Sequence, residues 1–155
     1  MIRRTRGFTF IELLVVVLVM SILSSLALLK WIDLKHRALS ASATADLQAV
    51  RLAAYSAWYE HGVWPAEEGA GTVPGGLVPY LPSGFEFARP DYTLDWDNFV
   101  PPGGGPSGAM QLGVVVSTGN ARLMRALQTS LGSKAPFLVV GGTLTFVIVG
   151  PDGRI

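Results

Sequence analysis

The N-terminal part of the chain contains the stretch that decides its fold, RGFTFIELLVVVLVMSILSSLALLKW at residues 6–31. Between Arg6 and Lys30 the only charged residue is Glu12. The 22 residues at positions 8–29 are otherwise aliphatic or aromatic, apart from one Thr and three Ser. As a helix they extend over roughly 33 Å, and the hydrocarbon core of a bilayer is about 30 Å thick. Length and composition therefore predict a membrane-spanning helix.

The overall composition excludes several classes of protein. The chain has 155 residues, which is the size of one domain, and 50% of them are hydrophobic while only 15% are charged. Disordered chains are polar and rich in charge, so this composition excludes disorder. The net charge of +1 disfavours a strongly basic nucleic-acid binder. Because the chain has no Cys, it has no disulfide, no thiolate metal site and no cysteine nucleophile.

Three ordinary interpretations compete for the apolar stretch. It fits a plain signal anchor, or a cleaved secretory signal whose basic region is Arg3, Arg4 and Arg6 and whose small-x-small cleavage site is Ser25-Leu26-Ala27. The pair Arg3-Arg4 also fits the start of a twin-arginine signal. A secretory apolar region is normally about 7–15 residues long, and this one is longer and continues into a helical pattern.

None of these interpretations explains Glu12. A carboxylate well inside an apolar helix costs about 2.5–3.5 kcal/mol on insertion scales, so such a residue predicts a function and a partner. No cation lies within the span. We therefore expect the partner of Glu12 to come from elsewhere. The alternative is a lipid-facing Glu12 that is protonated in place.

The order Arg6-Gly7-Phe8-Thr9-Phe10-Ile11-Glu12, followed by an aliphatic run, resembles the processing motif of type IV pilins and type II secretion pseudopilins. The resemblance implies that a prepilin peptidase cuts between Gly7 and Phe8 on the cytoplasmic side and methylates the new N-terminal Phe8. It also implies that Glu12 pairs with the N-terminal amine of a neighbouring subunit during assembly. Many family members have Gly and Pro where this chain has Ser21 and Leu29, so we expect an unbroken helix here.

The resemblance also implies a location and a set of partners. It places the protein in the inner (cytoplasmic) membrane as a single-pass subunit with a cytoplasmic N-terminus and a periplasmic or extracellular head, assembled into a pilus or pseudopilus. Its partners would be the prepilin peptidase, other pilin-like subunits and the inner-membrane assembly machinery. The absence of Cys, and hence of the C-terminal disulfide loop of many type IV pilins, favours a pseudopilin or minor pilin. The sequence does not choose between a secretion pseudopilus and a pilus.

The sequence predicts four segments: a cleaved basic leader at 1–7, a transmembrane and filament-core helix at 8–29, an amphipathic helix at 30–61 and a globular α+β head at 62–155. No Gly or Pro occurs between Gly7 and Gly62, so we expect one helix from about Phe8 to His61. Apolar residues at helical spacing predict that its second half packs into a core. They are Ile32, Leu39, Ala43, Leu47, Val50, Ala54 and Trp58.

Beyond the helix the pattern changes to strands. A breaker-rich loop at 62–84 precedes candidate strands at 85–88, 92–100 and 110–117, with a second Pro/Gly loop at 101–108. A helix is expected at 119–131, capped by Asn120 and ended by Gly132. Residues 137–140 and 143–149 flank Gly141-Gly142, which indicates a tight hairpin. The predicted fold is pilin-like: a long helix packed on an antiparallel sheet.

No set of residues in the sequence supports catalysis or a cofactor. Asp95 and Asp97 are weak calcium candidates, but they alternate with apolar residues along a strand, which favours a solvated acidic face. Along that strand Tyr92, Leu94, Trp96, Asn98 and Val100 share the other, apolar face. His36 and His61 are far apart, and the cations Arg122, Arg125 and Lys134 are too few to predict nucleic-acid binding. We expect a structural filament subunit; the alternatives are a membrane-anchored extracytoplasmic binding module that uses loops 62–84 and 101–108, and an anchored hydrolase.

Overall fold

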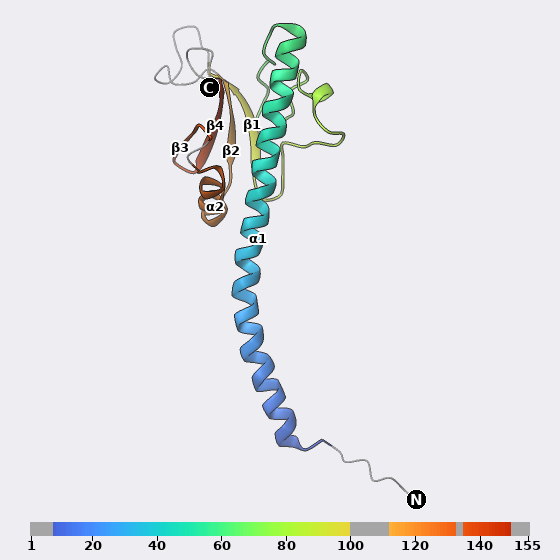
Figure 1. Ribbon diagram of the computed structural model, residues 1–155, viewed down its shortest axis with the longest axis vertical. Coiled ribbons are helices and arrows are strands. Elements are labelled where there is room, and N and C mark those ends of the chain that lie inside the picture. The colour runs from blue at the N-terminus through green and yellow to red at the C-terminus, as the bar shows by residue number, and fades with distance from the viewer. Residues whose placement is uncertain (1–7, 100–111, 133–134, 150–155) are drawn as a thin grey trace, which may run out of the picture. The chain divides into compact units, whose positions relative to one another are not determined.

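The computed structural model describes residues 8–99, 112–132 and 135–149. In chain order its elements are α1 (Phe10–His61), the short 3-10 helix η1 (Val78–Tyr80), β1 (Thr93–Asn98), β2 (Leu112–Ser117), α2 (Ala121–Leu131), β3 (Phe137–Val140) and β4 (Thr143–Val149), as Figure 1 shows. The chain divides into two compact units, with the boundary between Lys35 and His36. The long helix and the sheet confirm the predicted α+β fold.

The first unit consists of the beginning of helix α1. Every residue from Phe8 to Trp31 is exposed, including all of the large apolar side chains. By length and composition α1 is able to cross a membrane, and none of its most apolar window is buried. The helix is unbroken through Ser21 and Leu29, as the sequence predicts.

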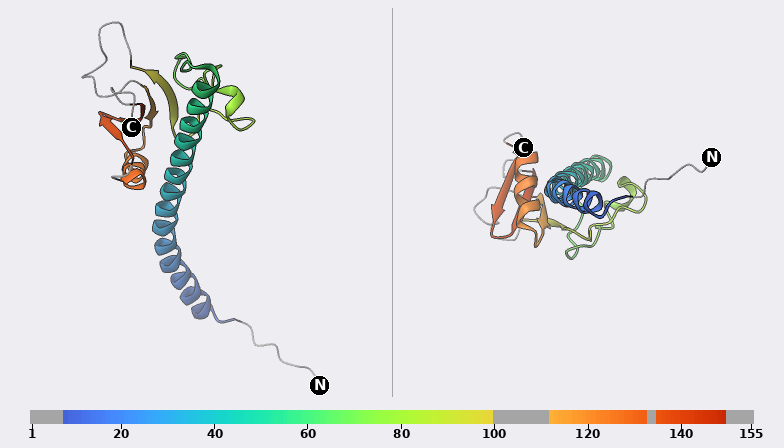
Figure 2. Two further views of the ribbon diagram at one scale, coloured as in Figure 1. Left: turned by 45° about the horizontal axis from the view of Figure 1, so that its top comes forward. Right: turned by 90° about the horizontal axis from the view of Figure 1, so that it is seen from below.

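The second unit is built on an antiparallel sheet of four strands in the order β1-β2-β4-β3. Figures 1 and 2 show the sheet and α2 beside the second half of α1. The β3–β4 hairpin turns at Gly141-Gly142 as predicted, with Val140 opposite Thr143. Gly141 has a φ of 60°, a conformation that glycine adopts without strain.

The core of this unit lies between α1 and the sheet. Helix α1 contributes Ala43, Leu47, Val50 and Ala54, which confirms that part of the predicted apolar stripe. Leu39 lies at its margin, and Trp58 is exposed to 43%. Alternate residues of β1 are buried against the helix, namely Leu94 and Trp96. Small alanines let the backbones approach closely, and complete burial of a side chain such as Leu47 contributes about 1.5–3 kcal/mol.

Helix α2 begins and ends where the sequence predicts. The side chain of Asn120 accepts hydrogen bonds from the backbone N–H groups of Arg122 and Leu123, at 3.0 and 3.2 Å. Gly132 forms the C-cap. The buried face of α2 consists of Leu123, Met124, Leu127 and Leu131.

Two predictions about the strands are wrong. Residues 85–88 form no strand, and only Ala88 makes a bridge, to Thr93. The chain turns back at Pro90 and Asp91, so there is room for only a short ladder before β1 begins. The strand predicted at 92–100 is shorter, since β1 ends at Asn98, which is exposed there and donates its backbone N–H to Glu67. Val100, the whole loop at 101–108 and Lys134 lie outside the described residues.

Candidate functional site

The first turn of α1 is held by a reciprocal pair of capping hydrogen bonds between Thr9 and Glu12. The Glu12 carboxylate oxygen Oε2 accepts from the Thr9 backbone N–H at 2.9 Å and from its hydroxyl at 2.8 Å. The Glu12 backbone N–H donates in turn to the Thr9 hydroxyl oxygen at 3.4 Å. This is a capping box, in which both side chains satisfy N–H groups that have no partner within the helix. The helix therefore begins at Phe10 rather than at Phe8.

The capping box gives Glu12 a partner in its own chain, while the expectation that a cationic partner comes from elsewhere stays a prediction. Thr9 is a polar partner within the same chain, and the spacing Thr-x-x-Glu in front of an apolar run is the signal that would have predicted it. Thr9 carries no charge, however, so these hydrogen bonds leave the negative charge of the carboxylate without a counter-charge. An ionised carboxylate can accept about four hydrogen bonds, and Thr9 provides two of them.

The other residues predicted for processing lie at the same end of the chain. Phe8 precedes the helix and is exposed to 79%. Gly7 lies outside the described residues. Glu12 and Phe8 are thus in or beside the first turn of α1, whose apolar residues are all exposed as far as Trp31. The removal of such a surface from water requires lipid or other protein chains.

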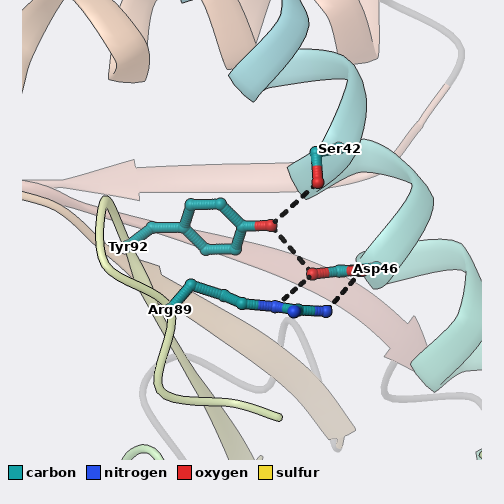
Figure 3. A network of polar contacts seen from close by, with 4 residues as sticks. All are labelled: Ser42, Asp46, Arg89 and Tyr92. Carbon is teal, nitrogen blue, oxygen red and sulfur yellow. Dashed lines mark hydrogen bonds and ion pairs between the residues drawn. The ribbon is translucent and has the colours of Figure 1, made fainter. Parts of the chain in front are cut away.

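A second polar site, which the sequence did not predict, lies inside the second unit. Asp46 on α1 is only 9% exposed. Its carboxylate accepts hydrogen bonds from Arg89 at 3.2 and 3.4 Å and from the hydroxyl of Tyr92 at 2.8 Å, as Figure 3 shows. The hydroxyls of Tyr92 and Ser42 are 3.5 Å apart. Burial raises the pKa of Tyr92; Ser42 lowers that pKa, and the hydrogen bond to Asp46 raises it further.

This network joins α1 to the segment that leads into β1. A buried carboxylate is costly unless it is paired and hydrogen-bonded, and here a guanidinium and a phenol provide both. Arg89 also lies over the ring of Phe85, 5.4 Å from its centroid. The polar atoms of this network are directed toward one another, so its role is to stabilise the packing of α1 against this segment. Helical periodicity alone indicates neither Arg89 nor Tyr92 as a partner of Asp46.

Asp95 and Asp97, the weak calcium candidates, belong to no metal-binding group within the part of the chain that the structure describes. Asp95 and Asp97 lie on the less buried face of β1, as the alternation predicts. Partial burial raises the pKa of Asp97 to about 6, and the nearby carboxylates of Asp95 and Glu67 contribute to the shift. Among the described residues, no group of three or more His, Asp or Glu side chains is arranged to hold a metal ion.

The two histidines have separate partners. The His36 ring nitrogen Nε2 lies 3.1 Å from the side-chain amide nitrogen of Asn120. The corresponding atom of His61 lies 3.1 Å from the hydroxyl of Tyr80. Each histidine therefore belongs to a local contact at a different end of the second unit's part of α1.

Comparison with known proteins identifies the N-terminal feature. The model of the family described as "Prokaryotic N-terminal methylation motif" matches residues 2–28. No curated protein and no solved structure matches the chain significantly. The match contains Phe8, Thr9 and Glu12 together with most of the exposed apolar helix, and the long helix with an antiparallel sheet is an arrangement like that of pilins. The chain therefore carries the N-terminal methylation motif that is the signature of type IV pilins and pseudopilins.

Proposed function

We propose that this protein is a structural filament subunit, either a pseudopilin of a type II secretion system or a minor pilin of a type IV pilus. The observation that carries the proposal is the methylation motif at residues 2–28, which includes the beginning of a helix whose apolar residues are all exposed as far as Trp31. Proteins with this motif are substrates of prepilin peptidase. The peptidase cleaves between Gly7 and Phe8, removes the leader at 1–7 and methylates Phe8. The apolar helix at 8–29 then remains as membrane anchor and assembly surface.

Glu12 sets the register of assembly. Cleavage creates an α-amino group at Phe8, which is largely cationic near neutral pH. In an apolar environment the amine of one copy and the Glu12 carboxylate of the next neutralise each other. Subunits stacked out of step leave both charges unpaired, at a cost of about 3–5 kcal/mol for a broken buried pair. The capping box supports this role, because Thr9 orients the carboxylate while leaving about half of its acceptor positions free.

The protein is anchored in the inner membrane with its N-terminus in the cytoplasm and its head, residues 62–155, outside it. Its partners are the prepilin peptidase, other pilin-like subunits and the inner-membrane assembly machinery. Residues 30–61 carry the helix from the membrane into the head, where Ala43, Leu47, Val50 and Ala54 are buried in the core. Anchoring and assembly of this kind need no cofactor.

The test is the N-terminus of the protein purified from the membranes of its native cell. We expect N-terminal sequencing to begin at Phe8, and intact mass to show the residues from Phe8 onward plus one methyl group. A chain that still begins at Met1, or one that begins near Leu28 after removal of the apolar helix, would overturn the proposal. The control is the same cell with a catalytically inactive prepilin peptidase, in which the leader should stay in place. Gly7→Ala alone is not a sufficient control.

A further inference from the structure

An open groove of about 750 Å³ lies beside the last turns of α1. We call it the aromatic groove. Its lining residues are Tyr55, Ser56, Trp58, Tyr59, Glu60 and Tyr80. Tyr59 is exposed to 88%. Trp64 supports the groove from behind, with its ring stacked on Trp58 at a centroid distance of 5.5 Å and an angle of 20°. Exposed aromatic rings gathered on a firm support mark an interaction surface.

The groove has the chemistry to hold a guanidinium group. Among the six lining residues only Glu60 is charged, and it accepts a hydrogen bond from the hydroxyl of Tyr80. A carboxylate with one such bond still has acceptor positions free. The faces of aromatic rings attract cations, most often arginine. The groove already makes one contact of this kind, because Arg51 lies 5.9 Å from the centroid of the lining residue Tyr55.

Helix α2 presents a matching cationic face. Arg122 and Arg125 are both exposed, and α2 contains no acidic residue. Arg122 lies in the first turn of the helix, where the macrodipole is positive and disfavours cations. Arg125 donates only to the backbone oxygen of Ala121, at 3.3 Å, and within the described residues neither arginine makes an ion pair. A local cost of this kind is offset when the arginines meet an anionic partner.

The arginines do not reach the aromatic groove of their own copy. Helix α2 contacts α1 through Asn120 at His36 and through Ser130 at Thr44, with distances of 3.1 and 3.2 Å. The groove lies at residues 55–60 of the same helix. The two surfaces are thus separated by about 17 residues of α1, or about 25 Å along its axis. A second copy displaced along the helix direction is able to bring them together.

We propose that the aromatic groove of one copy binds the Arg122–Arg125 face of helix α2 of a second copy. Each copy then uses two different surfaces, so the contact is heterologous and leaves one free surface at each end of a stack. Contacts of this type extend into open filaments rather than closing into dimers. The inference rests on the proposed function, because one-directional stacking is useful only to a subunit that polymerises.

The experiment uses the absence of cysteine from the full-length chain. Ser56→Cys places a thiol in the groove and Ala121→Cys places one beside the arginines, while every aromatic and charged side chain of the contact is kept. A disulfide needs Cα atoms about 4.4–6.8 Å apart, so the distance of about 25 Å within one copy prevents an intramolecular bond. We expect mild oxidation of native membranes to give a ladder of cross-linked multimers from the double variant and at most dimers from either single variant.

Two controls make the result specific. The first control combines Ala121→Cys with Val140→Cys, at a site outside the groove that is exposed to 74%. We expect at least tenfold less cross-linked multimer from this variant than from Ser56→Cys/Ala121→Cys. Glu60→Arg in the Ser56→Cys/Ala121→Cys background should reduce the ladder by a similar factor. Adding Arg122→Glu and Arg125→Glu to that variant should restore it, a result that misfolding cannot produce.

The outcomes separate this inference from the proposed function. Sheared filaments of a protein that begins at Phe8, together with no ladder from Ser56→Cys/Ala121→Cys, would overturn the groove contact alone. A ladder of equal strength in the Val140→Cys control, or one unaffected by Glu60→Arg, would overturn it as well. A protein that keeps its leader and forms no filament in its native cell would overturn the proposed function too.

Discussion

The two halves of helix α1 form one continuous helix but differ in what surrounds them. From Phe10 to Trp31 every side chain is exposed, whereas eight residues between Ser40 and Ala57 are buried in the head. Both halves lack Gly and Pro, so their backbones are equally suited to a helix. The difference lies in the packing partner, because the second half packs on a sheet from its own chain, whereas no described residue covers the first half. An apolar helix without a partner in its own chain requires lipid or other copies.

The largest expected effect tests the charge in the first half. Glu12→Ala should leave cleavage and methylation at Phe8 intact but reduce filament yield by about 100-fold or more, since about 3 kcal/mol or more is lost when a buried pair is broken. Sheared filaments and N-terminal sequencing measure the two steps separately. Ser21→Ala, a change on the same exposed helix without a charge, should assemble normally. Normal filaments from Glu12→Ala would refute the register role.

A change in the second half of α1 should affect the stability of the head and leave processing at Phe8 unchanged. Leu47 is fully buried between α1 and the sheet, so Leu47→Ala should lower the free energy of unfolding of the head by about 2–5 kcal/mol. Processing at Phe8 should be unchanged, because the peptidase acts on the other unit. Chemical denaturation of the full-length protein in detergent measures the first effect. Equal stability of Leu47→Ala and the parental protein would show that the core is not where the structure has it.

The Asp46 network allows a second test of stability within the head, on polar instead of apolar contacts. Asp46→Ala removes the acceptor shared by Arg89 and Tyr92 and should lower the free energy of unfolding by about 1–3 kcal/mol. Arg89 is partly exposed, so its guanidinium recovers some hydration and the loss stays below that of a fully buried pair. Ser42→Ala, which removes only the longest contact of the network, is the matched control and should cost little.

Asp97 gives the head a pH dependence. Its pKa is raised in the folded protein from 3.8 to about 6, so protonation favours the folded state. Its contribution to stability is therefore present below about pH 4 and is lost as the pH rises through 6. Because the side chain is only partly buried, the loss is about 1 kcal/mol after allowance for solvent screening. Asp97→Asn should raise stability at pH 7 by about that amount and flatten the curve between pH 4 and 6; a change only below pH 4 would contradict this.

The smallest effect tests the helix start. Thr9→Val keeps the shape of the side chain but removes the hydroxyl that caps α1, at a cost of about 1 kcal/mol. We expect filament yield to fall by several-fold at most, far less than for Glu12→Ala, because the carboxylate keeps its charge. Thr9→Ser should restore the yield. An equally severe loss from Thr9→Val and Glu12→Ala would mean that hydrogen bonding, rather than charge, is the essential property of Glu12.

Local signals predicted most of the fold. The absence of breakers predicted α1, Asn120 and Gly132 predicted the ends of α2, and Gly141-Gly142 predicted the hairpin. These features depend on residues close together in sequence, where backbone geometry and capping chemistry act directly. The segment predicted as a strand at 85–88 has suitable residues, but its pairing with the start of β1 is limited to a single bridge, between Ala88 and Thr93. Pairing is a property of the whole sheet and not of four residues.

The polar and aromatic sites required the tertiary structure. Asp46 and Arg89 are 43 residues apart, and Tyr80 meets Glu60 across 20 residues. The sequence shows each side chain but not which of them share a surface. By contrast, the capping box of Thr9 and Glu12 is visible in the sequence as a four-residue spacing, because both residues belong to one helical turn.

The sequence by itself determined the N-terminal region of this protein: its processing motif, its apolar span and its lone carboxylate lie within consecutive residues, and their chemistry needs no fold to be recognised. Only the tertiary structure decided which apolar residues of α1 are buried, which groups neutralise Asp46 and where aromatic side chains gather. The physical reason is distance along the chain. Covalent neighbours meet in any conformation, whereas residues far apart in sequence meet only after the chain has lost its conformational freedom to a particular core.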